Sequence, residues 1–249
     1  MKPGFVLIGL ILVQILTSCT TNKLLSADFE GDTVGSLPAL GLPGEPAGDE
    51  MQCIQCGSGD YRVISKTSGT PPETTKWLEI FGNISTPTEQ RTMIFVPIRR
   101  TLDNPVYTVT WRGSIVHPGR DSNPFYINLF SGSATGSQSY FSLIFKRERH
   151  RGLDVSSVYL SENGEDEEDA ELIGRVRPDA PHAMTVFINS ENRTFTIAGS
   201  GLPNNIEKSI PSSITNVREP VIWMSFVEPG IGVYQIDNIQ IIEGKRTED

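Results

Sequence analysis

Aromatic and hydrogen-bonding side chains occur together at two places, Trp111 with Arg112 and Tyr126 with Asn128. An aromatic ring can stack on the apolar face of a sugar, while amide and guanidinium groups bind its hydroxyls. Tyr126 and Asn128 are two residues apart, so on a strand they point to the same side. Trp111 shares the apolar side of its own segment, which leaves Arg112 on the polar side. We therefore choose Tyr126, Asn128 and Arg112 as candidate carbohydrate-binding residues and assign Trp111 to the core.

No catalytic motif accompanies these residues. Nucleophilic hydrolysis needs a Ser or Cys beside a His, and the Gly-x-Ser-x-Gly signature does not occur in the sequence. Elimination or glycoside hydrolysis needs paired carboxylates or a set of Tyr, His and Arg side chains. Because no spacing assigns such a set, we name no catalytic residue and favour binding over catalysis.

Two cysteines, Cys53 and Cys56, form a Cys-x-x-Cys motif followed by Gly57. A redox motif would open a helix, which the glycines after the motif disfavour. A zinc site needs a second pair of ligands, and the three histidines of the chain are isolated from one another. Haem attachment needs a His directly after the second Cys. We therefore expect a small disulfide clip between Cys53 and Cys56, as is common outside the cytoplasm.

The first 18 residues have the pattern of an export signal, with Lys2 ahead of an apolar run over residues 5–16. This run is too short to span a bilayer core of about 30 Å. It ends in Leu16-Thr17-Ser18-Cys19, which resembles the lipobox of bacterial lipoproteins. The resemblance implies cleavage before Cys19, attachment of acyl chains such as palmitate to this residue, and anchoring in the membrane. The alternative is an ordinary signal peptide with an incidental cysteine.

Residues 19–25 would then form a lipidated tether ahead of the folded domain. In Gram-negative lipoproteins an Asp after the lipidated cysteine usually retains the protein at the inner membrane. Here Thr20 follows Cys19. The resemblance therefore implies a lipid anchor in the outer membrane.

The overall composition excludes one large class of partner. The chain has 249 residues, with 21 Lys and Arg against 30 Asp and Glu, and a formal net charge of −9. Nucleic-acid binding needs a basic face, so we expect no nucleic-acid partner. Gly and Pro number 23 and 17, which fits many short strands joined by turns.

Apolar residues recur with period two, and no segment has a sustained helical stripe. This pattern predicts one antiparallel two-sheet β-sandwich over residues 26–243, with a tail over 244–249. A hairpin is expected from 184–188 and 195–197 across the turn Ser190-Glu191-Asn192. The other predicted strands are 26–30, 61–66, 76–81, 91–98, 105–116, 124–131, 138–146, 153–160, 171–176, 221–227 and 232–242.

The two ends of this domain carry recognisable strings. Near the start is Asp28-Phe29-Glu30-Gly31, followed by Thr33-Val34-Gly35, and near the end is Ile236-Asp237-Asn238-Ile239. Together they resemble the concanavalin A-like lectin/glucanase (laminin-G-like) superfamily. The resemblance implies an all-β jelly roll in which the first and last strands lie side by side.

This fold carries several functions, so the resemblance leaves the activity open. It favours a lipid-anchored envelope protein that binds a polysaccharide or takes part in surface interactions. One alternative is a polysaccharide lyase or glycoside hydrolase of the same fold. The other is a structural envelope lipoprotein without a ligand.

If the terminal strands pair, acidic residues from both ends meet. Glu30 and Asp237 would lie close together, and Asp28 shares the strand face of Glu30 by period two. Carboxylates together with carbonyls suit calcium. We therefore list Glu30, Asp237 and Asp28 as candidate ligands of a structural calcium ion. In the alternative, Asp237 and its neighbours bond only backbone groups.

Overall fold

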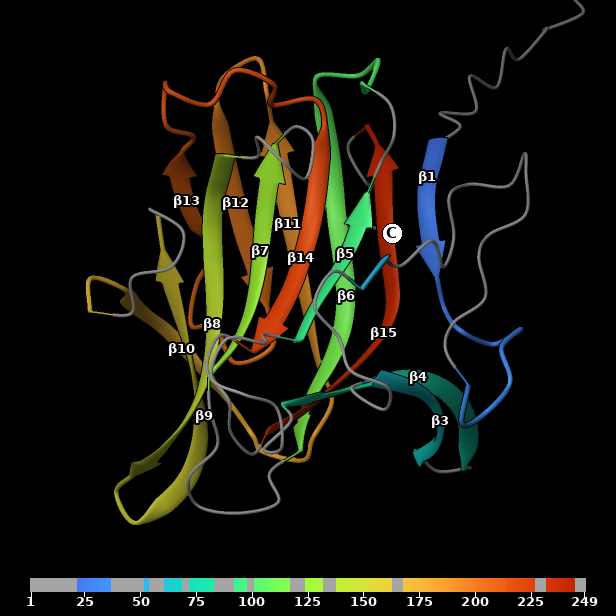
Figure 1. Ribbon diagram of the computed structural model, residues 1–249. Coiled ribbons are helices and arrows are strands. Elements are labelled where there is room, and N and C mark those ends of the chain that lie inside the picture. The colour runs from blue at the N-terminus through green and yellow to red at the C-terminus, as the bar shows by residue number, and fades with distance from the viewer. Residues whose placement is uncertain are drawn as a thin grey trace, which may run out of the picture.

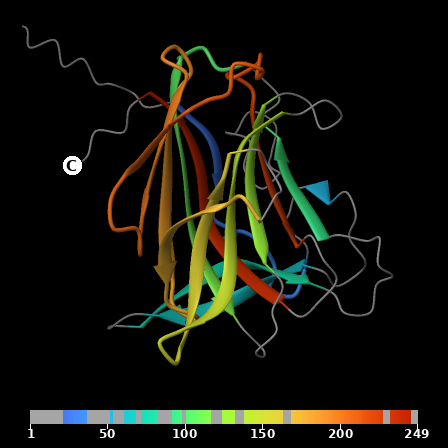
Figure 2. The same cartoon turned by 90° about the vertical axis from the view of Figure 1, so that its left-hand side faces the viewer.

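A computed structural model of the protein describes residues 22–36, 52–53, 61–68, 72–82, 92–97, 101–116, 124–131, 138–162, 168–226 and 232–244. The regular structure in these ranges is β-strand, and the ranges contain no helix long and apolar enough to cross a membrane. The strands form two antiparallel sheets that lie as two layers (Figures 1 and 2). The expected two-sheet jelly-roll sandwich is confirmed.

One layer is an eight-stranded sheet that contains both ends of the described chain. Its order is β13 (Ile206–Ser209), β12 (Thr194–Gly199), β11 (His182–Asn189), β6 (Val106–Val116), β15 (Gly232–Glu243), β4 (Glu73–Gly82) and β3 (Tyr61–Ser68), with β1 (Asn22–Ala27) also paired to β15. The pairs Asn22↔Glu243 and Ala27↔Ile239 place the first strand beside the last (Figure 1). This pairing agrees with the resemblance.

The other layer is a seven-stranded sheet. Its order is β10 (Glu171–Val176), β9 (Leu153–Ser161), β8 (Gln138–His150), β7 (Phe125–Ser131), β14 (Pro220–Phe226), β5 (Thr92–Pro97) and β2 (Gln52–Cys53). Strands β3 and β4 of the first sheet lie at the lower right in Figure 1. β4 pairs with residues 232–236, the first half of β15, and β3 pairs with β4.

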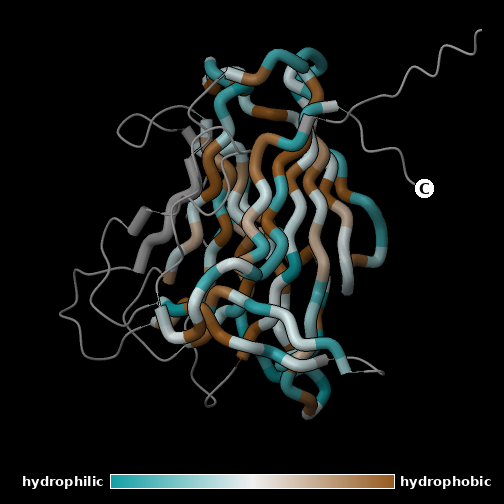
Figure 3. Tube along the Cα trace, turned by 90° about the vertical axis from the view of Figure 1, so that its right-hand side faces the viewer, coloured by the Kyte–Doolittle hydropathy of each residue, from teal (hydrophilic) through white to brown (hydrophobic). Residues whose placement is uncertain are grey.

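The core lies between the two sheets, where alternate side chains of the facing strands meet. Figure 3 shows this alternation as hydrophobic and hydrophilic positions that succeed each other along the strands. Val109, Trp111 and Ile115 of β6 are buried here with Ile127 and Leu129 of β7. Trp111 is thus a core residue, as the sequence predicts, and burial of this apolar surface is the main force that joins the sheets.

Most strand predictions are confirmed within a few residues, and the differences have physical reasons. β1 begins at Asn22, so it includes part of the expected tether. It ends before Phe29, whose positive φ of 58° breaks the strand that was expected over 26–30. β2 and β13 were not predicted, because two and four residues are too few to show an alternating pattern.

A close approach in the core shapes the middle of β6. His182 Nε2 and the Tyr234 hydroxyl lie 3.0 Å apart, and both side chains are buried. Gly113 packs directly against this pair. A Cβ atom there would lie 2.7 Å from His182 Nε2 and closer still to Tyr234 Oη. The absence of a side chain at Gly113 therefore lets β6 pass over the His–Tyr pair.

Gly113→Ala should destabilise the protein by about 1–3 kcal/mol, because the new methyl group overpacks a dense core. The midpoint of thermal unfolding would then fall by several degrees, on the order of 2–4 °C per kcal/mol. Gly31→Ala is the matched control, since a Cβ there meets no atom within 4 Å. Equal melting midpoints for the two variants would contradict this account of β6.

Candidate functional site

The three predicted carbohydrate-binding residues do not lie on one surface. Tyr126 and Asn128 are on the outer side of the seven-stranded sheet, whereas Arg112 is on the outer side of the other sheet. Tyr126 is 4% exposed and Asn128 is 2% exposed, so neither forms an accessible platform. This corrects the sequence-based choice of one combined site. A substitution at Tyr126 would test packing rather than binding.

The predicted calcium ligands meet at the junction of β1 and β15. Asp28 and Glu30 lie close enough to Asp237 for their charges to raise its pKa. However, Glu30 Oε1 accepts a bond of 2.8 Å from the Lys76 backbone N–H, and Asp237 faces Arg112. Among the described residues no three His, Cys, Asp or Glu side chains could hold a metal ion. The calcium site at Asp28, Glu30 and Asp237 therefore stays a prediction.

Two other predicted features each depend on a residue outside the described ranges. Cys19 and Cys56 lie outside the described ranges, and Cys53 lies in β2. The lipid anchor at Cys19 and the disulfide between Cys53 and Cys56 therefore stay predictions.

Arg112 belongs to a group of polar side chains around one buried indole. We call this group the Trp77 cluster. It lies on the outer side of the eight-stranded sheet and spans β3, β4, β15 and β6. Its members are Arg62, Lys66, Trp77, Glu79, Arg112, Gln235 and Asp237.

Two cations lie over the indole of Trp77. The Lys66 Nζ atom is 4.6 Å from the ring centroid, and the Arg112 Cζ atom is 5.2 Å from it. Both distances are within the range of cation–π attraction. The indole is only 1% exposed. It therefore holds the two cations in place rather than offering an open face to a sugar ring.

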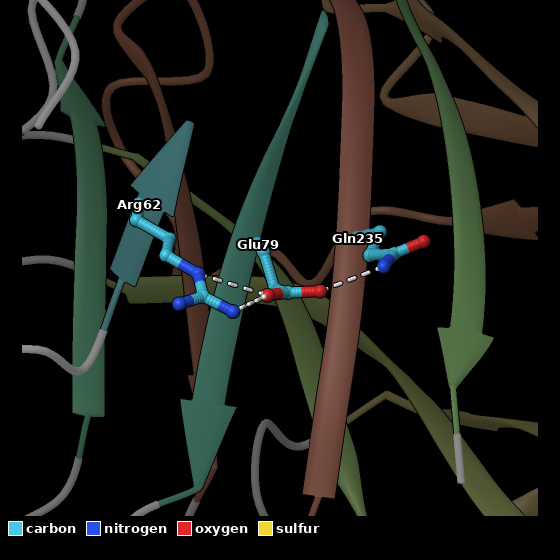
Figure 4. Close-up of polar contacts among 3 residues, drawn as sticks. All are labelled: Arg62, Glu79 and Gln235. Carbon is cyan, nitrogen blue, oxygen red and sulfur yellow. Dashed lines mark hydrogen bonds and ion pairs between the residues drawn. The ribbon is translucent and has the colours of Figure 1, made fainter. Parts of the chain in front are cut away.

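A chain of hydrogen bonds fixes the other side of the cluster (Figure 4). Arg62 donates from Nε and Nη2 to Glu79 Oε1, at 3.2 and 2.9 Å. Gln235 Nε2 donates to Glu79 Oε2 at 2.7 Å, and Lys66 Nζ donates to Gln235 Oε1 at 2.9 Å. Glu79 and Gln235 are buried, whereas the Arg62 side chain is exposed. Each polar group beneath the cations thus has a partner.

Arg112 is held more loosely than Arg62. Its nearest carboxylate oxygen in the described part of the chain is Asp237 Oδ2, which lies 3.6 Å from Nη1. The Arg112 side chain is 40% exposed and that of Asp237 only 5%. Burial raises the pKa of Asp237 to about 6, against the opposing effect of Arg112. At 3.6 Å the pair is an ion pair without a hydrogen bond, so the donors of Arg112 are not used by this carboxyl group.

Lys66 is also weakly neutralised. Burial lowers its pKa, and the neighbouring charge of Arg112 lowers it further. Asp179 and Glu79 act in the opposite direction through their negative charges. Within the described part of the chain, the Lys66 ammonium group donates one hydrogen bond, to the uncharged amide of Gln235. Lys66 thus has no carboxylate bonded to it there, and Arg112 has an ion pair with Asp237 but no hydrogen bond to it.

Of the Trp77 cluster, only Arg112 and Asp237 are predicted site residues. A usable signal for the others was present, because Arg62, Ile64 and Lys66 alternate along β3, as do Trp77 and Glu79 along β4. Alternation places each set on one side of its own strand. It does not say that β3 and β4 lie beside the first half of β15.

A surface cavity of about 250 Å³ offers a second candidate site. It is lined by Ser190, Arg193, Arg218 and Glu219, among others. Its polar groups serve the loops around it, since Arg193 donates to the Pro211 and Ile214 carbonyls. Glu219 accepts a bond of 2.8 Å from the Thr101 hydroxyl. These contacts give the cavity a structural role.

Comparisons with known proteins identify the fold and no family. No protein-family model matches the sequence, and no curated protein matches it. A carbohydrate esterase of the Shiga toxin-encoding bacteriophage phi24B is similar in structure, with a TM-score of 0.56 and 9% identity, over 90% of this chain and 100% of that chain. A cysteine variant of alginate lyase A1-II′ has a TM-score of 0.50 and 7% identity, over 68% and 80% of the two chains.

The potassium-bound carbohydrate recognition domain of Emp46p has a TM-score of 0.43 and 10% identity, over 76% of this chain and 90% of that chain. Its similarity is too low to support an argument about this protein. The chain thus has a two-sheet antiparallel jelly-roll fold, and its own residues must carry any functional argument.

The raised pKa of Asp237 makes stability depend on pH. The unfolded chain releases this proton near pH 3.8 and the folded protein near pH 6. The unfolding free energy should therefore fall as pH rises from 4 to 6, by up to about 3 kcal/mol. Asp237→Asn should lack this loss, so its stability relative to the wild type should increase across that interval.

Urea unfolding of both proteins at pH 4, 5, 6 and 7 measures this difference. The comparison with the wild type is needed because His182 has the opposite effect: burial lowers its pKa from 6.5 to about 4, so its contribution to stability is lost as pH falls. That contribution is common to both proteins. A constant difference between them at all four pH values would contradict the prediction for Asp237.

Proposed function

We propose that this protein is a lipid-anchored glycan-binding protein of the bacterial envelope, and that the saccharide binds at the Trp77 cluster. One observation carries the proposal. Arg112 presents a half-exposed guanidinium group on an open sheet face, and the described residues give it no hydrogen bond. Guanidinium groups bind oxygen acceptors in fixed directions, and sugars are rich in such acceptors.

The surroundings of Arg112 support a preformed binding surface. Glu79 and Gln235 are buried and hydrogen-bonded, and Trp77 fixes the cations from below. Such networks hold donor groups in one geometry before a ligand arrives, which lowers the entropic cost of binding. The jelly-roll fold is compatible with this role but does not by itself imply it.

The proposed anchor leaves the cluster accessible to a polymer. β1 begins at Asn22, only three residues after Cys19, so acylation there would hold this end of the sandwich at the membrane. Asn22 is paired with Glu243, and Asp237 lies six residues before Glu243 on β15. At about 3.3 Å per residue, this separates the cluster from the anchored end by roughly 20 Å.

Binding fits the geometry better than glycoside hydrolysis or elimination. Both carboxylates of the cluster are buried, and Glu79 is occupied by Arg62 and Gln235. On the other sheet, Tyr159 donates to Glu148, and burial together with this bond raises the Tyr159 pKa to about 12. A tyrosine with a raised pKa is a poor base for elimination. Glu79 and Tyr159 are therefore poorly suited to act as an acid or base, and the Asp237 carboxyl group is buried behind Arg112.

A glycan array tests the proposed function, with the soluble domain lacking residues 1–21 as the probe. Arg112→Ala should weaken any binding that the array detects by about tenfold, equivalent to ~1.4 kcal/mol. Its unfolding free energy must be measured alongside, because the side chain packs over Trp77 and pairs with the buried Asp237. Arg149→Ala is the control, since Arg149 is exposed at the far end of β8 and the change in charge is the same.

Two results would refute the proposal. The first is the absence of glycan binding in the wild type, which would favour a structural envelope lipoprotein. The second is equal binding by the wild type and Arg112→Ala, which would move the site elsewhere. Release of reducing ends from a bound glycan would instead identify an enzyme.

Anchoring is tested separately with the full-length chain. Cys19→Ala removes the thiol that would be acylated, so the variant should remain an unprocessed precursor and leave the detergent phase on phase separation. Labelling with a palmitate analogue should mark the wild type only. Equal partition of both proteins into the detergent phase would show that Cys19 is not the anchor.

A further inference from the structure

We propose that the saccharide is anionic and that its carboxylate or sulfate group binds between Lys66 and Arg112. This inference rests on the proposed function and adds to it the chemical class of the ligand. It depends on the positions of the charges in the Trp77 cluster rather than on the fold.

Two of the three cations in the cluster, Lys66 and Arg112, make no hydrogen bond to a carboxylate of the described residues. Arg62 already makes two hydrogen bonds to Glu79 Oε1. Lys66 donates to the uncharged Gln235, and Arg112 is 3.6 Å from the nearest carboxylate oxygen. The pair Lys66 and Arg112 therefore keeps unused donor capacity, since an ammonium group has three donors and a guanidinium group has five.

The same two cations lie beside one ring and act on each other through their charges. Both lie within about 5 Å of the centroid of the Trp77 ring, at 4.6 and 5.2 Å. Their mutual repulsion is large enough to contribute to the lowered pKa of Lys66. An anion placed between them would relieve this repulsion while it accepts hydrogen bonds from both. Bonds between ionised groups are roughly twice as strong as neutral ones.

Three carboxylates face this pair and have to be weighed against it. Glu79 is engaged by Arg62 and Gln235, and Asp237 is almost fully buried below Arg112. Asp179 is exposed and attracts Lys66 through its charge alone, without a hydrogen bond between the two side chains. None of the three therefore occupies the exposed donors of Arg112. The ligand's anion would compete mainly with Asp179.

A neutral sugar suits this surface less well. Neutral saccharides gain much of their affinity by stacking on an exposed aromatic ring. Trp77 is 1% exposed and carries cations over its ring, so it offers no such platform. The partly exposed side chains of the cluster itself, Arg62, Lys66 and Arg112, are cationic donors, and they favour a ligand that supplies negatively charged oxygens.

The test uses matched pairs of polymers that differ only in charge. Polygalacturonate is compared with its methyl ester, and dextran sulfate with dextran, by isothermal titration of the soluble domain. At least one charged polymer should bind about tenfold more tightly than its neutral partner, because a charge-assisted contact is lost in the ester. The two pairs distinguish a carboxylate from a sulfate as the recognised group. Affinity should fall as NaCl rises from about 50 to about 500 mM.

Variants locate the anion on the protein. Lys66→Ala and Arg112→Ala should each weaken binding of the charged polymer by about tenfold. Arg112→Lys should restore part of the loss, since the charge returns without the planar fork. Asp179→Asn should strengthen binding a few-fold by removing a competing charge. Arg149→Ala, at the end of the basic stretch Lys146–His150 in β8, should leave the affinity unchanged.

The outcomes separate the inference from the proposed function. If a neutral polymer binds as tightly as its charged partner, and Arg112→Ala weakens both, the glycan site stands and the anionic class is wrong. If Arg149→Ala weakens binding as much as Arg112→Ala, the attraction is diffuse and the inference fails. If no polymer binds and the glycan array is also blank, the proposed function itself falls.

Discussion

β15 is paired along both edges, and the arrangement of the outer face depends on how it achieves this. One edge pairs with β6 over nearly its whole length. The other edge is shared, with β4 beside Gly232–Ile236 and β1 beside Ile239–Glu243. Between these partners the register shifts, and Asn238 adopts a positive φ of 53°. Asn tolerates this backbone conformation better than most residues do, so the register shift causes little backbone strain.

The step changes which residues of β15 face the core. Tyr234 and Ile236 point inward before it, whereas Ile239 and Ile241 point inward after it. An extra residue in one strand of a pair has this effect because side chains otherwise alternate strictly. As a result Gln235 lies opposite Glu79, and Asp237 lies opposite Arg112. The pairing of β15 with β4 on one edge and β6 on the other thus assembles the cluster.

Some features of the candidate site could be predicted from the sequence, and others could not. Alternation in the segment around Trp111 correctly gives an inward indole and an outward Arg112, since this depends on a single strand. It also gives the correct side for Tyr126 but not its burial, because periodicity describes direction and not what lies above a side chain. Lys66 and Arg112 come together only through the order β3–β4–β15–β6. That order is a property of the whole chain.

The buried acids Glu79 and Asp237 are better explained by the arginines that they hold in place than by a contribution to the stability of the fold. The protein already has an extensive apolar core between its sheets. Desolvating Glu79 and Asp237 is costly, and apolar residues in such places are often as stable or more so. Burial raises the pKa of Asp237, in line with this cost. What the acids provide is a fixed location for Arg62 and Arg112, beside a lysine that the indole and Gln235 hold. A surface that only had to be soluble would not need its charges ordered in this way.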